Sequence, residues 1–269
     1  MPVEAGQIRT TNPSVSASPY AFFLLVSGLS IPFYALGMAG GRLAGLTAQP
    51  TSALMAFVPM AAALILVYRR RGASETATLA LRAIDVHRVR HVHWYLAAVC
   101  LLPIAATLQY AVLRLTGTVL PPPIYAIDEI PVFIFLYFIG AIGEELGWQG
   151  YAFPALRSRC RTIPAALILG AFWSIWHVIP FIQIGHTTVW IVWHCLSIVA
   201  LRVIIVWLVT GSGGSIFIAV LYHMMINLPW SVIVNYGAFY NPFINFVILL
   251  LMAGLIIIFW HPPNDIHVQ

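Results

Sequence analysis

Eight long apolar stretches divide the sequence, and each is close to the length that a helix needs to cross a lipid bilayer. A spanning α-helix takes about 20 mostly apolar residues. The stretches are about 19–40, 51–68, 94–114, 130–150, 163–182, 189–210, 215–231 and 242–260. Only 8% of the residues are charged, whereas about a quarter are charged in a soluble domain. The sequence therefore predicts an all-α fold, a polytopic membrane helix bundle of about eight transmembrane helices.

The polar segments around these stretches indicate one domain. Residues 1–18 are polar and are predicted to be a disordered N-terminal tail, and residues 19–262 form a single transmembrane helical domain. The longest polar connection, residues 69–94, is predicted to hold a short helix at the membrane interface. The sequence shows no repeated halves, which disfavours a transporter.

Arginine placement predicts the orientation of the bundle. The arginines gather in two connections, between the second and third stretches and between the fourth and fifth, which must lie on the same side. They are Arg69, Arg70, Arg71, Arg82, Arg88 and Arg90, then Arg157, Arg159 and Arg161. Because positively charged loops favour the cytoplasm, we expect an integral membrane protein with both termini cytoplasmic. The net charge of +5 then reflects this orientation and not nucleic-acid binding.

Few polar side chains fall inside the apolar stretches, and the sharpest feature among them is a pair of adjacent acids. An ionisable residue in a spanning helix costs about 2.5–3.5 kcal/mol near the helix centre and indicates a functional site by default. The intramembrane set is Glu144, Glu145, Gln149, His177, His194, Arg202, His223 and Asn227. No purely structural account requires two acids side by side in such a helix.

Helical spacing separates the roles of these side chains. Neighbours on a helix lie about 100° apart, so Glu144 and Glu145 cannot share a face. Glu145 and Gln149 are four residues apart and can hydrogen-bond, as can His223 and Asn227. Three helices can then direct Glu144, His177 and the His223/Asn227 pair into one buried cavity. A carboxylate, imidazoles and an amide placed together suit the activation of water and the stabilisation of an oxyanion.

The same residues also have simpler, purely structural interpretations. His177 and His194 could each make only a hydrogen bond across the bundle. Arg202 lies near the end of its stretch, and we expect its side chain to extend to the membrane surface. The tryptophans near these residues, Trp148, Trp173 and Trp176, are expected to serve packing.

Three segments resemble the motifs of the CPBP family of intramembrane proteases, which includes the CAAX prenyl endopeptidases and proteins linked to bacteriocin processing. EELGWQGY (144–151) resembles the family motif EExGWRGY, WSIWH (173–177) resembles FxxWH, and HMMIN (223–227) resembles a His with Asn four residues later. All three occur in order within about residues 130–230, which is where the resemblance places the catalytic core. It also implies a peptide or protein substrate in or at the membrane, and favours a bacterial plasma membrane.

The resemblance implies roles for individual residues. Glu144 and His177 would activate water, Glu145 would be the supporting acid, and His223 with Asn227 would stabilise the oxyanion. Whether a metal takes part stays open. Glu144, His177 and His223 could ligate zinc in number and type, but the sequence contains no HExxH and does not require a cofactor.

Two positions depart from the family pattern. Trp173 stands where the family usually has Phe, and both residues suit aromatic packing. Gln149 stands where the family usually has Arg, which removes a positive charge near Glu145. We therefore expect a neutral Glu145 hydrogen-bonded to the Gln149 amide.

Two other function classes stay open. The departure at Gln149 favours a catalytically silent, family-like membrane protein that binds or regulates a partner. A haem- or ion-handling protein would use His177, His194 and His223 instead, since haem in such bundles needs paired axial ligands.

Overall fold

The protein is an all-α bundle, and most of its long helices are long enough to span a membrane. The computed structural model describes residues 17–39 and 51–260. Within these ranges seven helical runs are long and apolar enough to cross a bilayer, and Ile216–Val232 is a shorter apolar run. Over the same ranges no strand forms, apart from one isolated bridge between Tyr125 and Ile233. The predicted fold class is confirmed, and the shortest predicted span is the one that falls below spanning length.

The α-helices do not match the predicted spans one to one, because the spans 163–182 and 215–231 each contain two helices. They are α1 (Pro19–Met38), α2 (Val58–Arg71), α3 (Ala73–Leu81), α4 (Val92–Leu115), α5 (Ile130–Gly147), α6 (Phe153–Arg157), α7 (Thr162–Trp176), α8 (Val178–Gln183), α9 (Thr188–Gly211), α10 (Ile216–Asn227), α11 (Pro229–Val232) and α12 (Pro242–Phe259). Short 3₁₀ helices are η2 (Thr51–Phe57), η3 (Arg82–Ile84), η4 (Val86–Arg88) and η6 (Tyr236–Ala238), and η5 (Trp148–Ala152) is a π-helix. The predicted tail, residues 1–18, lies outside the described residues except for its last two.

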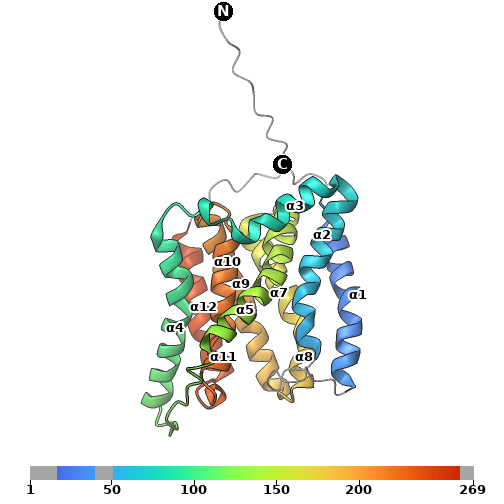
Figure 1. Ribbon diagram of the computed structural model, residues 1–269. Coiled ribbons are helices and arrows are strands. Elements are labelled where there is room, and N and C mark those ends of the chain that lie inside the picture. The colour runs from blue at the N-terminus through green and yellow to red at the C-terminus, as the bar shows by residue number, and fades with distance from the viewer. Residues whose placement is uncertain (1–16, 40–50, 261–269) are drawn as a thin grey trace, which may run out of the picture.

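The two arginine-rich connections lie at the same end of the bundle. Figure 1 shows α3 across this end, while α8 and α11 lie at the opposite end. Arg159, after α6, donates a hydrogen bond to the Ala17 carbonyl before α1, at 2.9 Å. Arg82, after α3, donates to the Gly214 carbonyl between α9 and α10. We call this the arginine-rich end; α3 corresponds to the short helix predicted in the 69–94 connection.

Helix α5 runs through the middle of the bundle and packs closely on η2 and α2. A Cβ atom on Gly143 would lie 2.7 Å from the Ala56 carbonyl oxygen, and one on Gly147 would lie 2.5 Å from that of Pro59. Residues at these positions must therefore be glycine for the two backbones to approach. On its other side α5 contacts α10, while α7 packs on α9 and α9 on α12.

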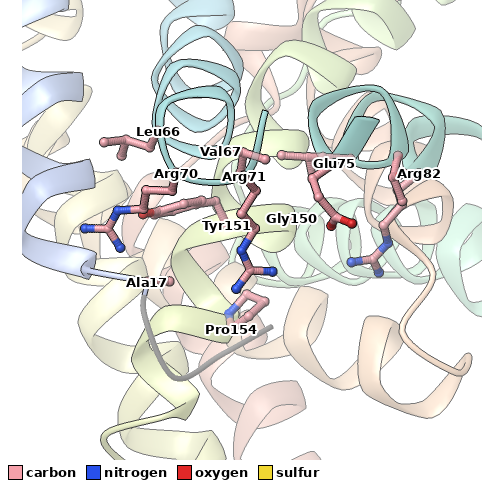
Figure 2. Close-up of a pocket in the computed structure, with 12 residues that line it drawn as sticks. Ala17, Leu66, Val67, Arg70, Arg71, Glu75, Arg82, Gly150, Tyr151 and Pro154 are labelled. Atoms are coloured by element: carbon pink, nitrogen blue, oxygen red, sulfur yellow. The ribbon is translucent and has the colours of Figure 1, made fainter. Parts of the chain in front are cut away.

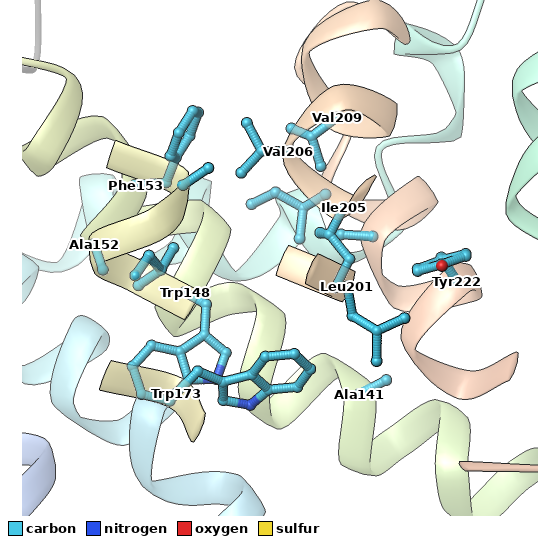
Figure 3. Close-up of a cluster of buried hydrophobic side chains, with 14 of the residues drawn as sticks. Ala141, Trp148, Ala152, Phe153, Trp173, Leu201, Ile205, Val206, Val209 and Tyr222 are labelled. Atoms are coloured by element: carbon cyan, nitrogen blue, oxygen red, sulfur yellow. The ribbon is translucent and has the colours of Figure 1, made fainter. Parts of the chain in front are cut away.

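Large apolar side chains fill the space between these helices. Figure 3 shows Trp148 and Trp173 beside residues of α9 such as Leu201 and Ile205, with Tyr222 of α10 across from them. All five side chains are buried. This packing encloses the ends of α5 and α7 that carry the predicted site.

The N-terminus of α10 is fixed from the arginine-rich end. Buried Asp85 accepts hydrogen bonds from the Ser215 hydroxyl at 2.7 Å and from the Phe217 amide at 3.1 Å. A carboxylate at this position satisfies amides that the helix leaves unpaired and suits the helix dipole. Asp85 therefore anchors the helix that carries His223.

Candidate active site

Three helices bring a buried polar cluster together inside the bundle. Glu144 and Glu145 come from the last turn of α5, and both are buried. Arg202 comes from α9 and His223 from α10. His223 lies eight residues beyond Ser215, which is about 12 Å along the helix at 1.5 Å per residue. The cluster is therefore well inside a hydrocarbon layer about 30 Å thick.

A fully buried ion pair joins α5 to α9. Arg202 Nη1 lies 2.8 Å from Glu145 Oε2, and both side chains have 0% exposure. The guanidinium carbon also lies 4.0 Å from the centre of the Trp173 ring, a distance at which an aromatic face attracts a cation. The prediction that Arg202 extends to the membrane surface is wrong, because an ionised carboxylate inside the bundle offers it a partner.

His223 bridges the two acids. Its Nδ1 lies 2.7 Å from Glu145 Oε1, and its Nε2 lies 3.8 Å from Glu144 Oε1. Because the Glu145 carboxylate is bonded to Arg202, we assign the Nδ1 proton to the bond with Glu145. Nε2 is then the nitrogen that faces Glu144, and Glu145 is an orienting group for the ring.

Two tryptophans hold the Glu144 carboxylate. Its Oε2 accepts hydrogen bonds from Trp173 Nε1 at 2.7 Å and from Trp148 Nε1 at 3.1 Å. Trp173 thus does more than pack, and its indole N–H is a donor that phenylalanine could not supply. Trp148 was missed as a site residue, although its position four residues after Glu144 is a helical contact spacing. Trp176 donates instead to Ser30 of α1, at 2.7 Å.

Gln149 does not take the part that the sequence predicted. Neither its amide nitrogen nor its amide oxygen has a hydrogen-bond partner within the described residues, and the side chain is buried. The predicted hydrogen bond between Glu145 and Gln149 is therefore wrong. The physical reason is that Arg202 and His223 already occupy both Glu145 oxygens.

His177 and Asn227 lie around the cluster without direct bonds to the acids. His177 follows α7, and its Nδ1 is 2.8 Å from the Trp173 carbonyl oxygen, so that nitrogen carries the proton. Its ring contacts Trp173 edge-on at 5.6 Å between centroids. Asn227 ends α10 one turn beyond His223, and in the described part of the chain no hydrogen bond joins it to the acids.

His194 belongs to a different set of contacts. It is hydrogen-bonded to the Tyr240 hydroxyl and stacks on Trp190. This agrees with the simpler interpretation of His194 as a residue that bonds across the bundle.

The candidate metal ligands do not form a metal-binding group. Across residues 17–39 and 51–260, no three His, Cys, Asp or Glu side chains are grouped so that they could hold a metal ion. The three possible zinc ligands therefore do not form such a group: Glu144, His177 and His223. In both histidines Nδ1 is already hydrogen-bonded, to a carboxylate or to a carbonyl.

The fold and the cluster define a class: an integral membrane helix bundle with a buried carboxylate–imidazole site. Within that class, residues 126–229 match the family described as type II CAAX prenyl endopeptidase Rce1-like. This match confirms the family resemblance predicted from the three motifs, which all lie inside the matched residues.

A curated relative supports the same resemblance. The chain is 31% identical over 113 residues to a protein of Methanococcus maripaludis named CAAX prenyl protease 2. The matched part is 39% of this chain and 41% of the relative. The chain therefore spans about two fifths of the length of the curated relative that it matches.

Proposed function

We propose that the protein is an intramembrane endopeptidase that hydrolyses a peptide bond with water activated by Glu144. The observation that carries the proposal is the gap of 3.8 Å between Glu144 Oε1 and His223 Nε2. The other atoms of both groups are fixed by Trp148, Trp173 and Glu145. A polar gap slightly too wide for a direct hydrogen bond suits a water molecule bonded to both atoms.

The net charge of the cluster indicates that it holds one additional proton, which such a reaction needs. Two ionised carboxylates and one guanidinium leave a net charge of −1 in the buried cluster. A proton on His223 Nε2 would neutralise it, and a buried group favours neutrality. We propose that His223 carries that proton and faces Glu144 across the gap.

The reaction then follows from the positions of the two groups. With the proton on His223 Nε2, Glu144 takes a proton from water as its oxygen bonds to the peptide carbon. The bond from that carbon to nitrogen breaks as His223 Nε2 gives its proton to the leaving amine. The proton on Glu144 returns to His223 and restores the starting state, which is general base and general acid catalysis by one pair.

The resemblance divides the roles differently. It implies that His177 assists Glu144 and that His223 and Asn227 stabilise the oxyanion. We propose His223 as the partner of Glu144 because it makes the contact described above. His177 and Asn227 are left as the candidate groups for the oxyanion, and Gln149 is given no direct part.

For the substrate we propose a prenylated CAAX peptide presented at the membrane. The support is the matched family description and the name of the relative. The site lies about 12 Å along α10 from Ser215, within the depth of the bilayer that a lipid chain occupies. We also propose that the arginine-rich end faces the cytoplasm, as positively charged loops do.

The catalytically silent alternative loses its main support. It rested on the missing arginine at Gln149, but Arg202 supplies a positive charge to Glu145 at 2.8 Å from another helix. The positive charge that the motif arginine would place near Glu145 is therefore supplied by Arg202 instead.

Cleavage of a prenylated CAAX peptide by purified protein in lipid tests the proposal. Glu144→Gln keeps the shape and removes the base, so we expect cleavage to fall about 10²–10⁴-fold. Glu129→Gln, the same chemical change at an exposed position before α5, is the matched control and should retain full activity. Cleavage that survives Glu144→Gln, in protein with unchanged thermal stability, would exclude this mechanism.

A further inference from the structure

A pocket opens at the arginine-rich end, apart from the buried cluster. It has a volume of about 220 Å³ and lies between the end of α2, helix α3 and the π-helix that follows α5. Figure 2 shows its lining residues, with side chains of α2 and α3 facing the chain near Gly150 and Pro154. The proposed reaction uses none of the side chains that line it.

The pocket combines apolar walls with a positive rim. Leu66, Val67 and Leu79 supply apolar surface. Three arginines and one glutamate also line it, Arg70, Arg71, Arg82 and Glu75, which gives a net charge of +2. Arg82 contacts Asp85 and Gly214. Arg70 and Arg71 also make other contacts, which a ligand would share or exchange.

A buried hydroxyl independently points to a ligand. Tyr151 lines the pocket and is only 6% exposed, yet its hydroxyl has no hydrogen-bond partner within the described residues. Figure 2 shows its side chain reaching toward Arg70. A buried hydroxyl without a partner is unfavourable, so this atom is suited to a polar group that arrives from outside the protein.

The position of the pocket indicates that the polar group bound there belongs to a lipid. The span Ala53–Arg71 ends at the pocket, and the span Ile130–Arg157 runs past it. The ends of spanning helices lie at the level of lipid headgroups, and basic pockets between such helices bind anionic headgroups. Arginine suits a phosphate because its planar fork can donate two parallel hydrogen bonds.

We propose that this pocket binds an anionic phospholipid of the leaflet at the arginine-rich end. The lipid phosphate contacts Arg70 and Arg71 and accepts a hydrogen bond from the Tyr151 hydroxyl. The first part of an acyl chain lies against Leu66 and Val67. The bound lipid contacts the π-helix that continues α5, and α5 carries both acids. The lipid headgroup at this site is therefore in contact with the same helical segment that carries Glu144 and Glu145.

Lipid binding to the full chain, purified in a neutral detergent, tests this inference without any activity assay. Phosphatidylglycerol should be retained in native mass spectrometry and should raise the melting temperature more than phosphatidylcholine does. Inorganic phosphate serves as the soluble probe and should have no comparable effect. A full effect from inorganic phosphate, or equal effects from the two lipids, would overturn the proposal.

Substitutions locate the site. Arg70→Gln/Arg71→Gln should abolish the preference for phosphatidylglycerol, and Tyr151→Phe should weaken binding about fivefold through loss of one hydrogen bond. Arg69→Gln removes the same charge from a residue of α2 outside the pocket and should keep the preference. If the double variant does not fold, single Arg70→Gln replaces it. A preference that persists in Arg70→Gln, or binding that is unchanged in Tyr151→Phe, refutes the assignment.

Discussion

Replacing Arg202 by glutamine tests the ion pair that joins α5 to α9. The substitution leaves Glu145 at 0% exposure with no guanidinium at 2.8 Å, and it also removes the cation over the Trp173 ring. Removal of one partner of a buried ion pair typically destabilises a protein by about 3–5 kcal/mol, because the remaining charge is uncompensated. At roughly 2–4 °C per kcal/mol for a protein near this size, the melting temperature should fall by roughly 6–20 °C.

Thermal unfolding in detergent measures this effect against a matched control. Arg114→Gln makes the same chemical change at an exposed position in the last turn of α4, where a loss of charge has little effect. The double variant Arg202→Gln/Glu145→Gln removes both charges and should be more stable than Arg202→Gln alone. An Arg202→Gln protein as stable as Arg114→Gln would refute the inference that Glu145 depends on this guanidinium.

The remaining predictions use the same measurement or a labelling assay. Gln149→Arg should destabilise the wild type, because it adds a second buried guanidinium, but should recover part of the stability lost in Arg202→Gln; equal effects in both backgrounds would contradict the reasoning. Gly147→Ala should destabilise by about 1–3 kcal/mol through overpacking, since its Cβ would lie 2.5 Å from Pro59, whereas Gly140→Ala meets nothing within 4 Å and should be tolerated. In a chain without its native cysteines, Ser74→Cys should resist a membrane-impermeant thiol reagent in intact cells and Thr118→Cys should label; the reverse pattern would overturn the cytoplasmic placement of the arginine-rich end.

Much of the fold could be predicted from hydropathy, because a bilayer forces apolar segments of sufficient length into helices. The spans and the interfacial helix before Trp94 follow from segment length and arginine placement alone. The weak span at 215–231 was also visible in the sequence, because Pro229 interrupts it, and Ile216–Val232 is the run that is too short.

The partners within the site could be predicted less well. Helical spacing brought Glu144 and His223 into one site, but it offered Glu145 only a partner on its own helix, Gln149. The partner in the structure lies 57 residues away on α9, and no pattern within one helix can indicate a contact between helices. The donor role of Trp173 was hidden for the same reason, because its hydrogen bond to Glu144 depends on how α7 lies against α5.

The buried pair between Glu145 and Arg202 has a consequence for the order in which the chain is assembled. Translation produces α5 before α9, and each helix carries a charge that costs about 2.5–3.5 kcal/mol when it meets lipid alone. Helix α7, the spanning helix between them, contains no charged residue to relieve that cost. We therefore expect α5 to remain in contact with the insertion machinery, or in a shallow position, until α9 has been made and the two charges can enter the hydrocarbon together. A chain interrupted before Arg202 would hold Glu145 in the membrane without the guanidinium that it pairs with.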